Sequence, residues 1–354
     1  MKFKLGLFLV MFALLLSGCA PTPTTTPEDI IRQEGEYAIV DHFTSSANRV
    51  YHGTYLPIHQ ALEVGTRLVD LSKQHFSVDE YYMQEGEIIT LSRLGALVRR
   101  ESGTNPIGLN PPSGSLFPSG NGVDITDAIV VSDVLEVNFM KRRDNEYVLE
   151  GISIALVLNP SQSVDLGRVN ITPERLYEYG SDMGRKLESY LRSLAGGGDI
   201  PIYITLYSLG SVDAILPGNM IGEGLFLSRS GQFSQLNESW LLIPSNSSNE
   251  LDSITHNLFL QLKGQLQTLL PEAIGVFAKA RVINRSIDLM LIEVNTNVKT
   301  YTELQAVVQV ILNDIQEFET DRMDLKVHIR NLNSTLVLIE KKANDDDFTI
   351  IYLN

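Results

Sequence analysis

Few side chains in this sequence have the types and spacing that chemistry requires. The nearest approach to an acid–base pair is the acidic run of Asp79, Glu80, Glu85 and Glu87, where one carboxyl could donate a proton and another accept it. A solvated turn has the same pattern, and we adopt that interpretation. The six histidines never form the His-Glu-x-x-His spacing of a zinc site, and Cys19 is the only cysteine. We therefore predict no metal, no cofactor and no enzymatic activity.

Cys19 has surroundings that predict a specific modification. Two lysines precede an apolar run at 5–16, which ends in Leu16-Ser17-Gly18. A short basic segment, about a dozen apolar residues and a small-residue cleavage site make residues 1–18 a secretory signal peptide. Leu-Ser-Gly-Cys resembles the lipobox of bacterial lipoproteins, in which the cysteine carries the lipid. We expect diacylglycerol on Cys19 to hold the chain at the extracellular face of the cell membrane.

A candidate ligand surface joins the segment 81–87 to the Pro- and Gly-rich loop at 103–122. Pro and Gly there argue against helices and strands, and ordered loops of this length often carry binding. The side chains expected to contact an extended peptide or cell-envelope ligand are Tyr81, Tyr82, Asn110 and Phe117. The alternative is a loop that only packs over its domain.

Composition restricts the partners of the chain. Apolar residues make up 44% of the sequence, which is ample for large cores, and the formal net charge is −15. A strongly acidic surface is unsuited to binding the phosphates of nucleic acid or to pressing against anionic lipid. The sequence does not define the oligomeric state.

The helices and strands that must position these residues fall into two predicted domains. A Pro- and Thr-rich tether at 19–35 precedes the first of them. We predict an α+β fold of two domains, at 36–244 and 245–354, each a mainly antiparallel sheet with packed helices. Apolar periodicity and capping residues predict helices at 58–72, 90–100, 173–194, 250–270 and 302–318. Strands are expected at 37–40, 134–141, 147–158, 200–206, 224–227, 240–243, 275–283, 287–294, 324–330, 335–340 and 348–353, with 147–158 buried on both faces.

Several blocks, in order along the chain, resemble a known family. Tyr81-Tyr82-Met83-Gln84-Glu85-Gly86 is similar to the "YYxQEGQ" block of the CamS-type sex pheromone lipoproteins of low-GC Gram-positive bacteria. Further similar blocks are Gly65–Ser72, Gly108–Pro111, Glu150–Leu156 and Ile200–Gly218. Together they span most of residues 50–225.

The resemblance implies a membrane-anchored surface lipoprotein. It also implies that the tail of the signal peptide, within residues 11–18, is released as a short hydrophobic peptide pheromone. The mature chain is then expected to be a non-enzymatic binding module. The alternatives are an exported enzyme or an assembly factor that acts on components of the cell envelope.

Overall fold

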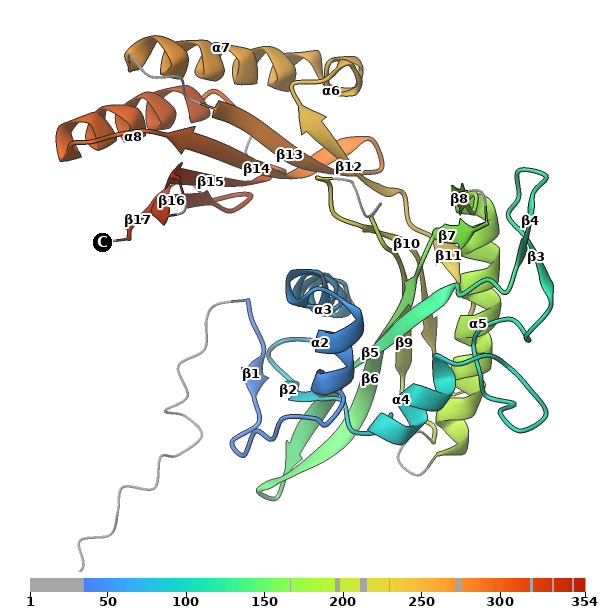
Figure 1. Ribbon diagram of the computed structural model, residues 1–354. Coiled ribbons are helices and arrows are strands. Elements are labelled where there is room, and N and C mark those ends of the chain that lie inside the picture. Colours follow the sequence, from blue (N-terminus) through green and yellow to red (C-terminus); the bar gives the residue numbers. More distant parts are fainter. Residues whose placement is uncertain are drawn as a thin grey trace, which may run out of the picture.

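The structure is a computed structural model that describes residues 35–353 apart from 166, 195–197, 211–214, 229, 271–274, 319–320, 333 and 346. The predicted signal peptide at 1–18 and Cys19 lie outside these residues, as does the tether at 19–35 apart from Gly35. In the described part of the chain, no helix is both long enough and apolar enough to cross a membrane. The described residues form an α+β fold built on two large sheets (Figure 1), which confirms the predicted fold class.

The first large sheet has seven strands in the order β1-β2-β5-β6-β9-β10-β11. Its strands are β1 (Ala38–Ile39), β2 (Tyr82–Glu85), β5 (Val131–Arg143), β6 (Glu146–Leu158), β9 (Ile202–Ser208), β10 (Asn219–Phe226) and β11 (Ser234–Gln235). Neighbouring strands are antiparallel except for β1 with β2 and β6 with β9. The β5–β6 hairpin turns at Asp144 and Asn145, whose positive φ angles suit a tight hairpin turn.

Separate apolar cores cover the two faces of this sheet. Residues 151–158 of β6 are all buried, and successive side chains alternate between the two cores. Burial on both faces, predicted for 147–158, is thus confirmed for 151–158, whereas 147–150 are half-buried or exposed. One core packs against α4 and α5, and the other packs against α3 with α2 beside it (Figure 1). The helices are α2 (Arg49–Tyr55), α3 (Ile58–Ser72), α4 (Leu91–Leu97) and α5 (Pro173–Ser193).

The start of α5 follows from its sequence. The Thr172 hydroxyl accepts the N–H of Arg175, and Pro173 occupies the first turn, where a missing N–H costs nothing. Glu174 adds a negative charge at the positive end of the helix dipole. This is the predicted cap, and it fixes one end of the helix that covers the outer face of the first sheet.

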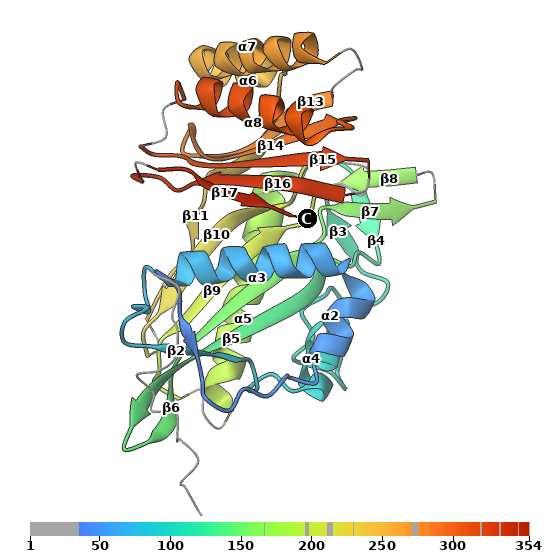
Figure 2. The same cartoon turned by 90° about the vertical axis from the view of Figure 1, so that its left-hand side faces the viewer.

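The second large sheet has six strands in the order β12-β13-β14-β15-β16-β17. Its strands are β12 (Glu238–Ile243), β13 (Gly275–Ile283), β14 (Ser286–Thr296), β15 (Asp324–Asn331), β16 (Ser334–Lys341) and β17 (Thr349–Tyr352). α6 (Asn246–Leu251), α7 (Ser253–Leu269) and α8 (Tyr301–Ile315) lie on one side of it, and α3 lies on the other side (Figure 2). Helix α8 connects β14 to β15, which are parallel neighbours.

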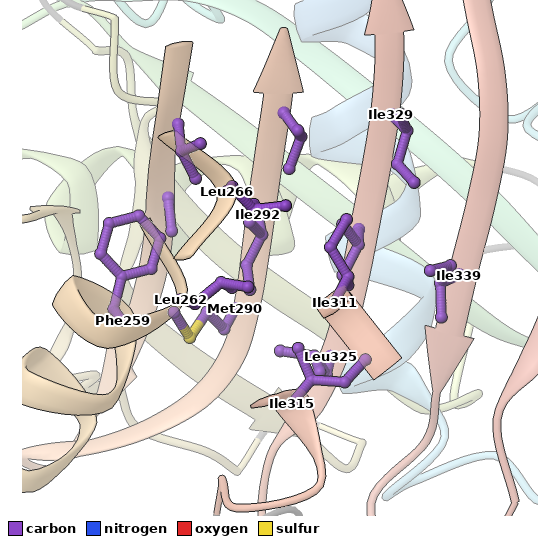
Figure 3. Close-up of a cluster of buried hydrophobic side chains, with 14 of the residues drawn as sticks. Phe259, Leu262, Leu266, Met290, Ile292, Ile311, Ile315, Leu325, Ile329 and Ile339 are labelled. Carbon is purple, nitrogen blue, oxygen red and sulfur yellow. The ribbon is translucent and has the colours of Figure 1, made fainter. Parts of the chain in front are cut away.

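The core of the second part lies between this sheet and its helices. Figure 3 shows Phe259 and Leu262 of α7 and Ile311 of α8 directed at Met290 and Ile292 of β14. All of these side chains are at least 99% buried. Packing of this kind makes the second sheet a rigid wall beside α3.

Three expectations about individual segments are wrong in detail. The predicted boundary at 244 puts the strand at 240–243 in the first domain, but β12 pairs with β13 and belongs to the second sheet. The helix expected at 250–270 is two helices, because Asp252 ends α6 in an extended conformation and caps α7. The Pro and Gly residues at 103–122 argue against a strand there, yet β3 (Leu116–Pro118) pairs with β4 (Asp124–Thr126). A second small sheet joins β7 (Ser161–Val164) to β8 (Gly167–Asn170).

Candidate functional site

Asn110 and Phe117, two of the residues predicted to contact a ligand, are buried. Asn110 is 1% exposed, and its side-chain amide donates to two backbone carbonyls and accepts from the N–H groups of Val130 and Val131. Phe117 is 3% exposed and packs edge to face on Tyr179, with ring centroids 5.1 Å apart. Both side chains hold the 103–122 loop on the domain, as the alternative interpretation of this loop expected.

Tyr81 packs against the other core of the first sheet, and Tyr82 is its neighbour at the start of β2. The Tyr81 ring packs against Phe76, with centroids 5.4 Å apart, and the Tyr82 ring packs against Tyr147 at 5.0 Å. Phe117 belongs to the core on the opposite face of the sheet. The structure therefore does not bring the four predicted side chains together into one surface.

An apolar pocket opens between α3, β1 and the β2–β5 pair, and we call it the α3–β2 pocket. Its volume is about 360 Å³, within the range of about 300–1,000 Å³ that is usual for small-ligand sites. Residues that line it include Ile39 of β1, Leu62, Gly65 and Val69 of α3, and Met83 and Glu85 of β2. The segments 65–72 and 81–86, which carry the family resemblance, thus contribute residues to its wall.

Large apolar side chains at this pocket are open to solvent. Leu62 is 64% exposed, Phe43 is 54% exposed and Ile39 is 37% exposed, although they come from two separate parts of the chain, the stretch at 39–43 and α3. Single exposed apolar residues are common on protein surfaces, but convergence on one pocket indicates a binding surface.

Gly65 leaves part of this pocket open. A glycine inside a helix costs about 1 kcal/mol relative to alanine, yet Gly65 is in the middle of α3. A Cβ built on it meets no described atom within 4 Å outside its own stretch of helix. Close packing therefore does not demand a glycine here, and any larger side chain would extend into the pocket.

The polar groups of the pocket are held in place by the backbone and by each other. His52 Nδ1 lies 2.8 Å from Asp133 Oδ2, and the Asp133 side chain is fully buried. The two carboxylate oxygens of Glu136 accept the N–H groups of Ile88 and Ile89 at 3.0 and 2.7 Å. Burial raises the pKa of the Glu136 carboxyl, although these two N–H donors oppose the shift.

Asn48 places an unpaired acceptor at the α3–β2 pocket. Asn48 is 4% exposed and lines the pocket, and its side-chain Nδ2 donates to the backbone carbonyl of Ile89. The Ile89 carbonyl fixes the orientation of the amide, because only the NH₂ group can face an acceptor. The other amide atom is therefore the oxygen, and Asn48 Oδ1 has no hydrogen-bond partner in the described structure. Such an atom is costly to leave buried without a partner, and it belongs to a residue that lines the pocket.

Two further cavities lie between the sheets. The larger, of about 940 Å³, lies beside α5, β10 and the β13–β14 turn. The other, of about 320 Å³, separates α3 from the open face of the second sheet. Arg67 and Glu238 line this cavity and form an ion pair, with Arg67 Nε 2.8 Å from Glu238 Oε2. Glu238 Oε1 also accepts the N–H of Met220, so this pair, the Arg67–Glu238 clasp, joins the second sheet to α3 and β10.

The described residues contain no group of three or more His, Cys, Asp and Glu side chains placed to hold a metal ion. Sequence reasoning missed Asn48, His52, Asp133 and Glu136. The signal that could have found them is the occurrence of Asp133 and Glu136 inside β5, where most neighbouring side chains are apolar and buried. A carboxylate inside a buried strand requires partners, and those partners form the polar side of the pocket.

Comparison with known proteins assigns the chain to a family. The family model described as CamS sex pheromone cAM373 precursor matches residues 43–347, which include elements of both large sheets. The chain belongs to the CamS family. The expected resemblance is thereby confirmed, and it extends beyond the quoted blocks into the second sheet. No curated protein matches the chain.

Solved structures show that this fold is shared by other CamS proteins. A sex pheromone precursor from Lactobacillus salivarius has a TM-score of 0.73 and 18% identity, over 91% of this chain and 95% of that one. The C-terminal domain of the staph-cAM373 precursor from Staphylococcus aureus has a TM-score of 0.69 and 20% identity, over 83% of this chain and 96% of that one. At these identities the likeness establishes the fold alone.

Proposed function

We propose that this CamS protein is an exported lipoprotein, anchored at the extracellular face of the cell membrane through diacylglycerol on Cys19. Its folded part is a non-enzymatic binding module. The support for export and anchoring is the leader at 1–18 with its lipobox-like end, together with membership of a family of pheromone precursors.

The observation that carries the binding role is the α3–β2 pocket. It combines solvent-open apolar walls with an unpaired buried acceptor at Asn48, and family-like segments contribute to its wall. An exported enzyme would use a carboxyl of raised pKa in such a pocket, and Glu136 has one. Both oxygens of Glu136 are engaged by backbone N–H groups, which favours a structural carboxylate.

Metabolic labelling with palmitate tests the anchoring. The wild-type chain should incorporate label and sediment with membranes, whereas Cys19→Ala should lose the label, because the thiol is the attachment point. Ser17→Ala keeps a small residue before the cysteine and serves as the matched control. A Cys19→Ala chain that stays fully lipidated would refute the anchoring proposal.

We also propose that the tail of the signal peptide, within residues 11–18, is released as a hydrophobic peptide. The resemblance to pheromone precursors supports this, and the apolar character of the segment suits it. Mass spectrometry of culture supernatant should find a peptide from 11–18, and the same peptide should induce conjugation in an activity assay. Its absence from supernatants of cells that process the lipoprotein normally would contradict the release.

A further inference from the structure

We propose that the α3–β2 pocket binds the free amino terminus of a short apolar peptide. This rests on the proposed binding role of the pocket and specifies its ligand. The first observation is the apolar wall, where Ile39, Phe43 and Leu62 are 37%, 54% and 64% exposed. Burial of these surfaces by aliphatic side chains of a ligand would supply most of the binding energy.

The charge of the pocket selects the end of the ligand. Glu85 and Glu136 line it, Asp133 is bonded to the lining residue His52, and none of the described lining residues is Lys or Arg. A negative site without cations disfavours a fatty-acid carboxylate or a lipid phosphate and favours an ammonium group. A ligand that carries an ammonium group next to apolar side chains fits this pocket, and the amino terminus of an apolar peptide is such a ligand.

Asn48 supplies an independent reason for a donor on the ligand. Asn48 is only 4% exposed, and its unpaired Oδ1 needs an N–H or O–H partner. A peptide offers backbone N–H donors as well as its ammonium group, whereas a simple alkylamine offers only its ammonium.

The size of the pocket limits the bound segment. At about 360 Å³ it is near the lower end of the range of about 300–1,000 Å³ for small-ligand sites. It therefore suits the first few residues of a peptide, with the rest of the peptide outside. The expected preference is for aliphatic residues next to the free amino group.

Fluorescence anisotropy with tri-leucine labelled on its carboxyl end tests the proposal. The full mature chain should bind this probe, and acetylation of the amino group should weaken binding about tenfold or more, because a charge-assisted contact is lost. Glu85→Gln should weaken binding of the free amine several-fold. Glu87→Gln, at an exposed neighbouring position that does not line the pocket, should bind as wild type.

A pocket-filling variant locates the binding. Gly65→Leu should abolish probe binding without loss of thermal stability, because the new side chain enters open space and leucine favours the helix. Gly65→Ala adds one methyl group and should retain most of the affinity. If Gly65→Leu binds like wild type, both the pocket assignment and the peptide proposal fail.

Competing ligands show whether the pocket binds peptide amino termini or whether it binds a different class of ligand. If the acetylated probe binds equally, or if decanoate or heptylamine competes as well as the peptide, the peptide-terminus proposal is overturned. A decanoate or heptylamine signal that Gly65→Leu removes would leave the α3–β2 pocket as a binding site. Peptide binding that depends on both the free amine and Gly65 supports the proposal.

Discussion

Asn110 and Asn48 are two buried amides that differ in how many of their hydrogen-bonding groups have partners. All of the Asn110 side chain is used to tie the 103–122 loop to β5 and to the end of α4. Asn48 leaves its oxygen without a described partner. The contrast separates an amide with every hydrogen-bonding group paired from one with an unpaired oxygen, although residue type and sequence position predict neither state.

Replacement of Asn110 tests this distinction at the scale of one residue. Asn110→Ala should lower the free energy of unfolding by about 3 kcal/mol or more, because it leaves several buried backbone groups without partners. Chemical denaturation measures the change, and Asn121→Ala, at an exposed position of the same loop, should cost much less. An Asn110→Ala protein of unchanged stability that fails to bind a ligand would restore Asn110 as a contact residue.

At the scale of elements, the Arg67–Glu238 clasp joins the two sheets. The side chains of Arg67 and Glu238 are 13% and 3% exposed, whereas Lys73, which follows α3 as its C-cap, makes its ion pairs near the surface. Removal of one member of a buried pair leaves the other charge unpaired, at a typical cost of about 3–5 kcal/mol. Surface pairs contribute about 0–1 kcal/mol.

Trp240, the only tryptophan in the chain, reports on the clasp. It lies two positions after Glu238 and lines the same cavity between α3 and the second sheet. Arg67→Ala should shift the Trp240 emission to the red at a lower urea concentration than the loss of helical circular dichroism, because the sheets separate first. Lys73→Ala is the matched control. Coincident transitions at the wild-type midpoint would show that the clasp does not hold the sheets together.

The sequence predicted α3 at its observed bounds of Ile58–Ser72, because its apolar period and length are clear. The apolar pattern does not show which of these side chains are buried in the core and which line a pocket. Val64 and Leu68 are fully buried in the core, whereas Leu62 lines a pocket and is exposed. That difference arises from where β1 and β2 lie relative to the helix, which periodicity does not encode. Nor does the sequence show that Tyr81 and Phe117 pack on opposite faces of the sheet, which keeps the four predicted contact residues apart.

At the scale of the whole molecule, buried tyrosines make the fold sensitive to alkali. Burial raises the pKa of Tyr37, Tyr179, Tyr203 and Tyr207 well above the ordinary value of 10.0. Nearby carboxylates also raise the pKa of all four, and Tyr203 and Tyr207 donate hydrogen bonds to Glu223 and Glu63. The folded state therefore holds these protons more tightly than the unfolded state does.

The sign of this linkage sets the pH window. Stability from these tyrosines is fully present below about pH 10 and is lost as the pH rises further, because the unfolded chain ionises first. Absorbance of tyrosinate should show these four of the 13 tyrosines ionising only as circular dichroism reports unfolding. Smooth ionisation of all tyrosines near pH 10 in a protein that stays folded would contradict the prediction.

The place of β1 in the sheet has a mechanical consequence. β1 consists of Ala38 and Ile39, forms an edge of the first sheet, and pairs only with β2 at Tyr82 and Met83. It is also the first strand after the tether, and Ile39 is part of the pocket wall. In a chain held at Cys19, tension from the membrane would reach this short edge strand before any larger element. A pull strong enough to peel β1 from β2 would remove one wall of the pocket, so that ligand release would respond to force.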